Sequence, residues 1–274
     1  MDRETIFGEL FDPLYAPLPD SETYLGRIGH GPVEKADRET LDSLVLAHQR
    51  NVPFENLDVY DARADISLGV AALYDKIVLR RRGGYCFELN AAFMALLTSL
   101  GFRCHAVSVR VVMGFDRHMP LSHRGTIVTI DGVRYFCDVG FGGPSPQSAL
   151  LLDERNAQKS GNYEFIIDEG PIGTNINILV GGKKERLLTF SETPSDPVDF
   201  LALNEFQSKS DYSMFKASRV CNLVTETGAI TLGGNALKIH ANGETTEKTL
   251  STEPELRAAL KEHFGIEVSF ALSI

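Results

Sequence analysis

The sequence predicts an α+β protein in which helices come first, antiparallel strands follow and a smaller mixed unit ends the chain. Apolar residues recur at helical spacing up to Leu100, whereas the segments after Gly101 are β-branched and alternate with polar residues. The pair Asp131-Gly132 separates two of these alternating segments, which is a strong signal for a β-hairpin with a type I′ turn. With 274 residues, the chain is long enough for one large domain or for two to three small subdomains.

Helical spacing of apolar residues predicts three helices in the first part of the chain. They span residues Thr40 to Gln49, Gly69 to Leu79 and Cys86 to Leu100. Gly101 provides the stop signal for the third helix. This helix begins directly at a cysteine, so the thiol lies in its first turn.

Alternation of apolar and polar residues predicts strands in the rest of the chain. The expected strands are Ala106 to Met113, His123 to Ile130, Val133 to Val139, Tyr163 to Ile167, Asn175 to Val180 and Arg186 to Phe190. The last part combines strand patterns over Phe215 to Val224 and Ala229 to His240 with a helix from Glu253 to Phe264. We therefore expect a helical unit over residues 1–101, a strand-rich unit over 102–207 and a mixed unit over 208–274.

Composition and charge narrow the class of function. The 43% hydrophobic and 23% charged residues are ordinary for a soluble globular protein. The sequence shows neither an apolar run of membrane-spanning length nor a secretory signal, so we expect a cytoplasmic protein. A net charge of −10 argues against a nucleic-acid partner. The basic cluster Arg80–Arg82 is interpreted as a helix end with one buried salt bridge, with attraction of a cofactor phosphate as the alternative.

The four cysteines differ in their surroundings. They are Cys86, Cys104, Cys137 and Cys221, without a CxxC pair or zinc-type spacing, so neither a disulfide scaffold nor a metal is expected. The last three lie in apolar, strand-like segments and are expected to be small core residues. Cys86 instead follows a glycine turn and starts a helix, where unpaired N–H groups and the helix dipole favour the thiolate. We interpret Cys86 as a nucleophile.

The predicted hairpin supplies a base and an orienting carboxylate for this nucleophile. With a two-residue loop, Ile130 pairs with Val133, and stepping back pairs Gly125 with Asp138. His123 and Asp138 then share a face as diagonal neighbours, with Cα atoms roughly 7–8 Å apart. The small Gly125 is expected to leave room for the imidazole ring. A register shift of one residue would place the two side chains on opposite faces.

Three motifs resemble those of the arylamine N-acetyltransferase family. They are Arg82-Gly83-Gly84-Tyr85-Cys86-Phe87-Glu88-Leu89-Asn90, Ser122-His123-Arg124 and Asp138-Val139-Gly140-Phe141-Gly142, and Val52–Leu57 resembles the family's Pro-Phe-Glu-Asn element. The likeness extends from about Tyr24 to about Ile266. It implies a helical bundle, a β-barrel and an α/β lid around a cysteine-protease-like core. The first twenty or so residues precede the family's usual start and are an extra helix or a disordered arm.

The resemblance also implies a reaction. Cys86, His123 and Asp138 would form a catalytic triad that transfers an acetyl group from acetyl-CoA to an arylamine, hydrazine or arylhydroxylamine. Acetyl-CoA would be a co-substrate, with no permanently bound cofactor and no metal. The resemblance implies that the acceptor is bound by Phe54, Val111 and Phe141. It implies that the coenzyme is bound by Ser122, Gly140, Gly142, Ser213 and Phe215. Glu55 and Arg82 would form a buried ion pair of the scaffold. Residues Ser208–Phe215 depart from the family pattern, in which His-Pro often precedes Ser-x-Phe.

Other interpretations of the same residues stay open at this point. A related amide synthase would act on polyketide-type acyl thioesters and would need a wide cleft beside Cys86. A Cys-His-Asp site would also suit a thioester hydrolase or a transglutaminase-like enzyme, and a binding role without catalysis is the remaining alternative. His118 competes with His123 as the base, although we expect it to be solvated.

Overall fold

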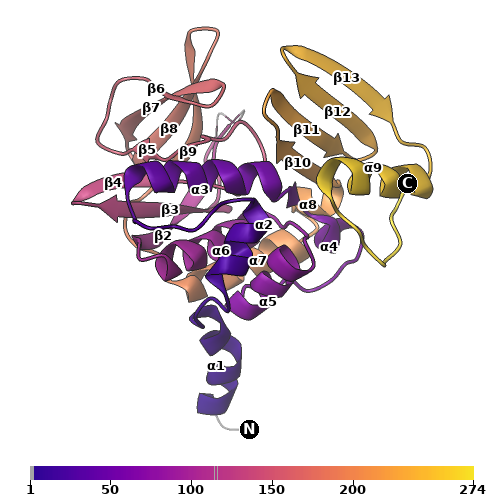
Figure 1. The fold of residues 1–274 in the computed structure, drawn as a ribbon, viewed down its shortest axis with the longest axis horizontal. Coiled ribbons are helices and arrows are strands. Elements are labelled where there is room, and N and C mark those ends of the chain that lie inside the picture. The colour runs from indigo at the N-terminus through magenta and orange to yellow at the C-terminus, as the bar shows by residue number, and fades with distance from the viewer. Residues whose placement is uncertain (1–2, 114, 116) are drawn as a thin grey trace.

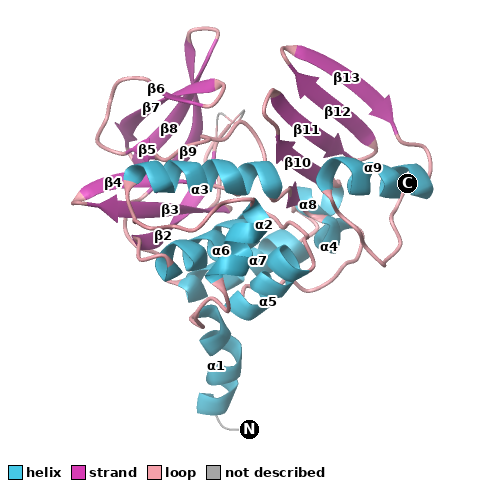
Figure 2. Cartoon of the chain, in the orientation of Figure 1, coloured by secondary structure: helices cyan, strands magenta, loops and turns pink. Residues whose placement is uncertain are grey.

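The computed structural model describes residues 3–113, 115 and 117–274, and Figure 1 shows three groups of elements. Helices from the first part of the chain form a bundle at the centre. Antiparallel strands flank the bundle on one side, and a second sheet with a helix flanks it on the other. Figure 2 shows the order of helices, strands and a mixed unit, which is the α+β arrangement that the sequence predicts.

The first part of the described chain contains six helices. They are α1 (Arg3–Phe11), α2 (Ser21–Ile28), α3 (Arg38–Asn51), α4 (Leu57–Tyr60), α5 (Val70–Tyr74) and α6 (Cys86–Ser99), with a 3₁₀ turn at Asp12–Leu14. The predicted helix from Gly69 to Leu79 is divided, because α5 continues as a π-helical turn over Asp75–Leu79. In Figure 1, α1 projects away from the bundle, so the extra N-terminal segment is a helix. α6 lies in the core, where Leu89, Phe93 and Leu96 are fully buried.

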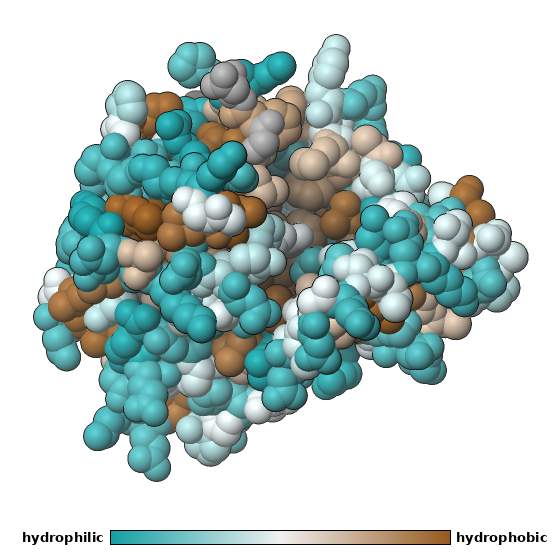
Figure 3. All heavy atoms as spheres, turned by 90° about the horizontal axis from the view of Figure 1, so that it is seen from above, coloured by the Kyte–Doolittle hydropathy of each residue, from teal (hydrophilic) through white to brown (hydrophobic). Residues whose placement is uncertain are grey.

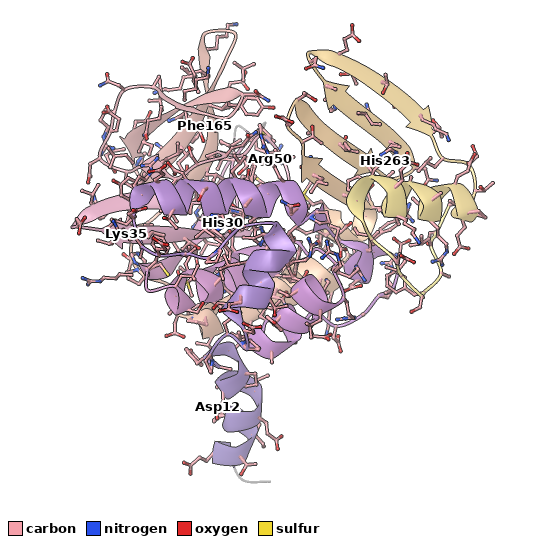
Figure 4. The ribbon with its side chains drawn as sticks, in the orientation of Figure 1. Asp12, His30, Lys35, Arg50, Phe165 and His263 are labelled. Carbon is pink, nitrogen blue, oxygen red and sulfur yellow. The ribbon has the colours of Figure 1, made fainter. Side chains whose placement is uncertain are left out.

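The second group is an antiparallel sheet of eight strands that rolls into an almost closed barrel. Its strands are β2 (Arg103–Val111), β3 (His123–Ile130), β4 (Val133–Cys137), β5 (Leu150–Leu151), β6 (Gln158–Ser160), β7 (Tyr163–Gly170), β8 (Gly173–Val180) and β9 (Lys183–Phe190), in the order β5-β4-β3-β2-β9-β8-β7-β6. Apolar side chains such as Val109, Phe136 and Phe165 fill the barrel, and Figure 4 labels Phe165 there. α6 packs across β2 and β3, so the barrel wall lies beside Cys86.

The third group covers the other end of the bundle. Its elements are β1 (Phe54–Glu55), β10 (Val220–Val224), β11 (Gly228–Gly233), β12 (Ala236–Ala241), β13 (Glu244–Thr249) and α9 (Glu253–Phe264). α7 (Phe200–Lys209), preceded by a 3₁₀ turn at Pro197–Asp199, and α8 (Met214–Ala217) connect it to the barrel. β1 pairs with β10, so the first part of the chain contributes an edge strand to this sheet. Figure 4 labels His263 on α9, which packs its apolar face on the sheet.

Two sequence predictions in this last group are wrong. The segment from Phe215 to Val224 is not one strand, because Ser213 accepts a hydrogen bond from the N–H of Phe215 and caps the short helix α8 before β10 begins. The segment from Ala229 to His240 is a hairpin of two strands, β11 and β12. The turn between them contains Gly234 with φ of 56°, a left-handed conformation that glycine adopts without strain.

The predicted barrel hairpin has the predicted register. Ile130 pairs with Val133, and the ladder continues to Thr126 opposite Cys137. Asp131 and Gly132 have φ of 50° and 81°, as a type I′ turn requires. The expectation that Gly125 leaves room for the imidazole ring of His123 is wrong, however. A Cβ on Gly125 would lie 2.5 Å from the ring of Phe136, so the space above this glycine holds the phenylalanine rather than the imidazole.

No helix in the described ranges has the length and apolar character needed to cross a membrane.

Gly83 is the position where the fold demands glycine most directly. A Cβ there would lie 1.9 Å from the carbonyl oxygen of Pro53, a contact between backbones that no rotamer change relieves. We expect Gly83→Ala to lower the free energy of unfolding by about 3 kcal/mol or more. Gly26→Ala is the control: Gly26 lies in α2 with nothing within 4 Å of its Cβ position, so alanine should stabilise the helix by roughly 0.5–1 kcal/mol. Urea unfolding curves measure both changes, and a Gly83→Ala protein as stable as the parent would contradict this packing.

Candidate active site

Cys86 lies at the first position of α6, and its side chain is almost fully buried. The residue is 3% exposed, and its sulfur lies 3.8 Å from the carbonyl oxygen of Ser122 in the chain leading into β3. The start of the helix is fixed by Glu88, whose Oε2 accepts a hydrogen bond from the backbone N–H of Tyr85 at 3.0 Å. The hydrogen bond of Glu88 therefore fixes where α6 begins, and the Cys86 thiol lies against the segment that leads into the barrel strand β3.

His123 and Asp138 form a buried pair beside this thiol. Nε2 of His123 lies 2.6 Å from Oδ2 of Asp138, and the two side chains are 2% and 0% exposed. Burial lowers the pKa of His123, but the charge of Asp138 and hydrogen bonds to Asp138 and Cys86 outweigh burial and raise this pKa to about 10. Since Nε2 faces Asp138, the other ring nitrogen, Nδ1, is left for the sulfur. His123 is therefore an imidazolium at neutral pH, next to the thiol.

The same pKa links the pair to stability. The folded-state value of about 10 exceeds the ordinary histidine value of 6.5. The pair therefore stabilises the folded protein fully below about pH 6.5, and this contribution is lost as the pH rises toward about 10.

Asp138 is held from the side of α6 by Asn90, a residue that the sequence analysis did not single out. Nδ2 of Asn90 donates to Oδ1 of Asp138 at 2.9 Å and to the carbonyl oxygen of Arg124 at 2.6 Å. Its Oδ1 accepts the N–H of Val139 at 3.0 Å. Asn90 follows Cys86 by one helical turn, so both lie on one face of α6. A polar residue four positions after the cysteine in an otherwise apolar helix was the signal available in the sequence.

Gln49 adds a second support that the sequence gave no reason to expect. Its Nε2 donates to the carbonyl oxygens of Asp138 and Pro146, each at 2.8 Å, from the end of α3. The N–H of Gly140 donates to Oδ1 of Asp138 at 2.9 Å. The carboxylate and the backbone around it are thus fixed by two helices that are distant in sequence, α3 and α6, and by the neighbouring backbone at Gly140.

A network of buried ion pairs lies behind the glycine turn. It joins Arg82 to Glu55 at 2.7 Å and to Asp58 at 2.9 Å, and Lys76 to Asp58 at 2.8 Å and to Glu88 at 2.7 Å. The expected Glu55–Arg82 pair is present, and Arg82 is the one buried residue of the basic cluster Arg80–Arg82. Removing one partner would leave a buried charge unpaired, which typically costs about 3–5 kcal/mol. The network therefore anchors the segment that leads to Cys86.

The residues predicted for the acceptor surround the imidazole from the outside. The ring of Phe141 lies edge-on to that of His123, with centroids 5.8 Å apart. The ring of Phe54 covers Gly142, whose φ is 71° and whose Cβ would lie 2.8 Å from that ring. Val111 and Phe141 each pack against the apolar core of the barrel. Phe54, Phe141 and Gly142 help to line a cavity of about 20 Å³, which has room for a water but not for an aromatic ring.

The residues predicted for the coenzyme divide into two groups. Ser122 and Gly140 lie at the thiol: a Cβ on Gly140 would be 3.0 Å from the Cα of Cys86, so the backbone passes very close. Ser213 is 2% exposed, and its hydroxyl donates to the carbonyl oxygen of Gln207. Phe215 packs edge-on against the ring of Tyr85, with centroids 5.3 Å apart. Ser213 and Phe215 therefore make internal contacts that support the site.

Two further cavities open between the barrel and the last group. One of about 160 Å³ is lined by Gly142, Cys221, Asn222 and their neighbours on β10 to β12, and one of about 260 Å³ is lined by Ser145, Gln147, Tyr163, His240 and others. Figure 3 shows the surface hollowed between these two parts, with apolar and weakly polar side chains facing the hollow. Both cavities adjoin the Gly142–Gly143 turn, which also lines the small cavity next to Phe54 and Phe141.

The remaining cysteines and histidines lie apart from this site. All four cysteines are free thiols; Cys137 and Cys221 are buried as predicted, whereas Cys104 is only half-buried, with its sulfur 3.5 Å from the hydroxyl of Thr98. His118 is exposed, as predicted. Within the described ranges, no group of three or more His, Cys, Asp or Glu side chains is arranged to hold a metal ion.

Comparison with known proteins places this geometry in a family. Residues 37–273 match the sequence profile described as N-acetyltransferase. The chain is 31% identical over 255 residues to the arylamine N-acetyltransferase of Mycobacterium tuberculosis (strain ATCC 25618 / H37Rv), covering 91% of this chain and 90% of the relative. The chain belongs to the arylamine N-acetyltransferase family. It is also 29% identical to arylamine N-acetyltransferase 1 of Homo sapiens, covering 91% of this chain and 94% of that one.

Solved structures of arylamine N-acetyltransferases share the fold of this family member. The enzyme from M. tuberculosis superposes with a TM-score of 0.85 at 31% identity, covering 90% of this chain and 94% of that chain. The enzyme from Mycobacterium marinum in complex with CoA has a TM-score of 0.84 at 31% identity, covering 90% and 93%. The fold of bundle, barrel and lid that the resemblance implied is therefore confirmed.

The charge of Asp138 is expected to control the reactivity of the Cys86 thiol. In Asp138→Asn, the charge of Asp138 and its hydrogen bond no longer raise the pKa of His123 as they do in the parent, while burial, which lowers this pKa, remains. The imidazole then becomes neutral near pH 7, and we expect alkylation of Cys86 by iodoacetamide to slow by at least about 100-fold. The control is Asp153→Asn, which removes a 60% exposed carboxylate of the barrel loop and should leave the rate unchanged. An Asp138→Asn protein that is folded and alkylates at the parent rate would contradict the coupling.

Proposed function

We propose that this protein is an arylamine N-acetyltransferase that carries the acetyl group on Cys86 between two half-reactions. The observation that supports this most directly is the buried imidazolium of His123, held by Asp138 and in hydrogen-bond contact with the thiol. A thiolate next to an imidazolium needs no separate activation before it attacks a carbonyl carbon. Family membership supports acetyl-CoA as the donor and an arylamine as the acceptor.

In the first half-reaction, the Cys86 thiolate attacks the thioester carbonyl of acetyl-CoA. The carbon–sulfur bond to the coenzyme breaks, the acetyl group stays on Cys86, and the CoA thiolate leaves with a proton from His123. Exchange of one thioester for another is nearly balanced in energy, so the site needs orientation and proton handling rather than a strong driving force. The unpaired N–H groups at the start of α6 are suited to stabilise the oxyanion.

In the second half-reaction, the amine nitrogen attacks the acetyl group on Cys86. His123, now neutral, takes the proton that the amine loses, the carbon–sulfur bond breaks, and the Cys86 thiolate returns beside the imidazolium. Asp138 keeps the ring in one orientation through both steps, as its contacts to Asn90 and Gly140 allow. After the second half-reaction, Cys86 is again a thiolate and His123 is again an imidazolium.

The coenzyme is proposed to enter through the hollow between the barrel and the lid. The cavities of about 160 and 260 Å³ there adjoin Gly142, and the similar M. marinum enzyme has been solved with CoA. In this proposal, residues 1–101 supply the nucleophile and residues 102–207 supply the base and its carboxylate. Residues 208–274 form the lid over the site. A cytoplasmic location belongs to the proposal, and the free state of all four cysteines supports it.

The narrow cavity lined by Phe54 and Phe141, of which Phe141 contacts the His123 ring, favours a small acceptor over a polyketide chain. Its volume of about 20 Å³ contrasts with the wide cleft that an amide synthase would need. Even an arylamine ring requires the side chain of Phe54 or Phe141 to move aside. Among the alternatives, transfer to a small amine therefore demands the least rearrangement.

Intact-protein mass spectrometry with acetyl-CoA tests the proposal. We expect the protein to gain one acetyl group in the absence of an amine, and to lose it rapidly when an aniline is added, with N-acetylaniline as the product. Cys86→Ala should gain no acetyl group, whereas the control Cys104→Ala, at a half-buried thiol, should behave like the parent. An adduct that decays in buffer at the same rate with and without the amine would indicate a thioester hydrolase instead.

A further inference from the structure

Arg124 is a buried cation without a carboxylate partner. The residue is 3% exposed, and its guanidinium contacts the sulfur of Met94 at 3.6 Å and lies 4.6 Å from the ring centroid of Phe200. Its Nε is buried and has no hydrogen-bond partner. Among the described residues, no Asp or Glu oxygen lies within ion-pair distance of it. Burying a charge in this way is costly.

Other buried cations of the chain are compensated, so Arg124 stands apart. Arg82 and Arg219 contact carboxylates at 2.7 and 2.6 Å, and Lys76 contacts one at 2.7 Å. Arg27 donates to backbone carbonyl oxygens, including that of Ile77 at 2.9 Å. The chain thus provides counter-charges or acceptors for the other large buried cations and leaves Arg124 with a thioether and an aromatic ring.

The surroundings of Arg124 indicate which charge it could balance. It follows His123 directly, and its carbonyl oxygen is fixed by Asn90 at 2.6 Å. Its guanidinium contacts Met94, which follows Cys86 by eight residues on α6, roughly 12 Å along the helix axis. Negative charge on the thiols of Cys104 and Cys86 would raise the pKa of Arg124. Burial lowers the pKa of Arg124 to about 10, so the side chain is a cation at neutral pH.

With Cys86 deprotonated, the three reacting side chains carry one net negative charge, and the ion-pair network behind the glycine turn, with three carboxylates and two cations, supplies no net positive charge to offset it. A Cys86 thiolate and the Asp138 carboxylate each carry one negative charge, and the His123 imidazolium carries one positive charge. This leaves one negative charge in a site whose three side chains are all buried. Tyr85, next to Cys86, is also buried, and burial raises its pKa above the normal range, so it adds no charge.

We propose that Arg124 is a positioning residue of the site, the counter-charge that stabilises deprotonated Cys86 from the side of β3 on which α6 packs. The inference rests on Cys86 being the nucleophile proposed above. At the separation of roughly 12 Å given by the helix rise between Cys86 and Met94, a unit positive charge should increase the thiolate fraction roughly tenfold. Arg124 acts before the acyl donor arrives and again when the thiolate leaves the acetylated enzyme, without touching either substrate.

The test compares Arg124→Met, Arg124→Lys and the parent, all in a Cys104→Ala background that removes the competing thiol. Methionine has a similar length without charge, and lysine keeps the charge. The pH dependence of Cys86 alkylation by iodoacetamide and of thiolate ultraviolet absorbance is measured on each full-length protein, together with thermal unfolding.

We expect Arg124→Met to remain folded with an unfolding temperature equal to or above that of the parent, because an unpaired buried charge has been removed. Its alkylation profile should move to higher pH by about one unit, with about tenfold slower alkylation below the midpoint. Arg124→Lys should restore most of the parent profile. A purely structural role predicts the opposite pattern: a lower unfolding temperature and an unmoved profile.

A folded Arg124→Met protein with the parent alkylation profile would overturn the proposal. If Arg124→Met does not fold, Arg124→Lys and Arg124→Gln provide the same comparison of charge with a polar side chain. Alkylation needs neither acetyl-CoA nor an amine, so failure of the proposed transferase activity would appear separately, as a parent protein that gains no acetyl group.

Discussion

The contact of 2.6 Å between Nε2 of His123 and Oδ2 of Asp138 is the interaction on which the rest of the site depends. The hairpin register places the two residues on one face, and the type I′ turn at Asp131-Gly132 fixes that register. Asn90 then ties the carboxylate to α6, which carries Cys86 one turn earlier. A helix of the bundle and a hairpin of the barrel are thus joined at the atoms that would react.

Electrostatics explains why so much charge is buried around one small site. A protonated His123 needs Asp138 to offset its burial, and a thiolate beside it brings the site to one net negative charge. The ion pairs of Arg82 and Lys76 hold the backbone that leads to Cys86, while Arg124 places a positive charge on the side of β3 where α6 packs. Burying these ion pairs and burying the Arg124 cation are both costly in a hydrophobic core, and both place charge around the Cys86 thiol.

Much of this architecture could be predicted because local signals agree with the tertiary structure. The Asp131-Gly132 turn, the helix from Cys86 and the helix from Glu253 have strong turn, stop or capping signals. Features that depend on contacts between distant residues could not be predicted. The side chain of Phe136 fills the space over Gly125. Asn90 becomes a site residue only because Asp138 packs against α6. The edge strand β13 (Glu244–Thr249) is entirely exposed and polar, so it lacks the alternation that reveals a strand.

The central claim is that His123 is positively charged beside Cys86 at neutral pH, and the most direct measurement is an NMR titration of its imidazole. Spectra of protein labelled with ¹⁵N-histidine, assigned with His123→Gln, follow that ring as the pH is raised. The account predicts that the ring stays protonated through neutral pH and titrates near pH 10. A ring that loses its proton near pH 6.5, as an ordinary histidine does, would contradict it.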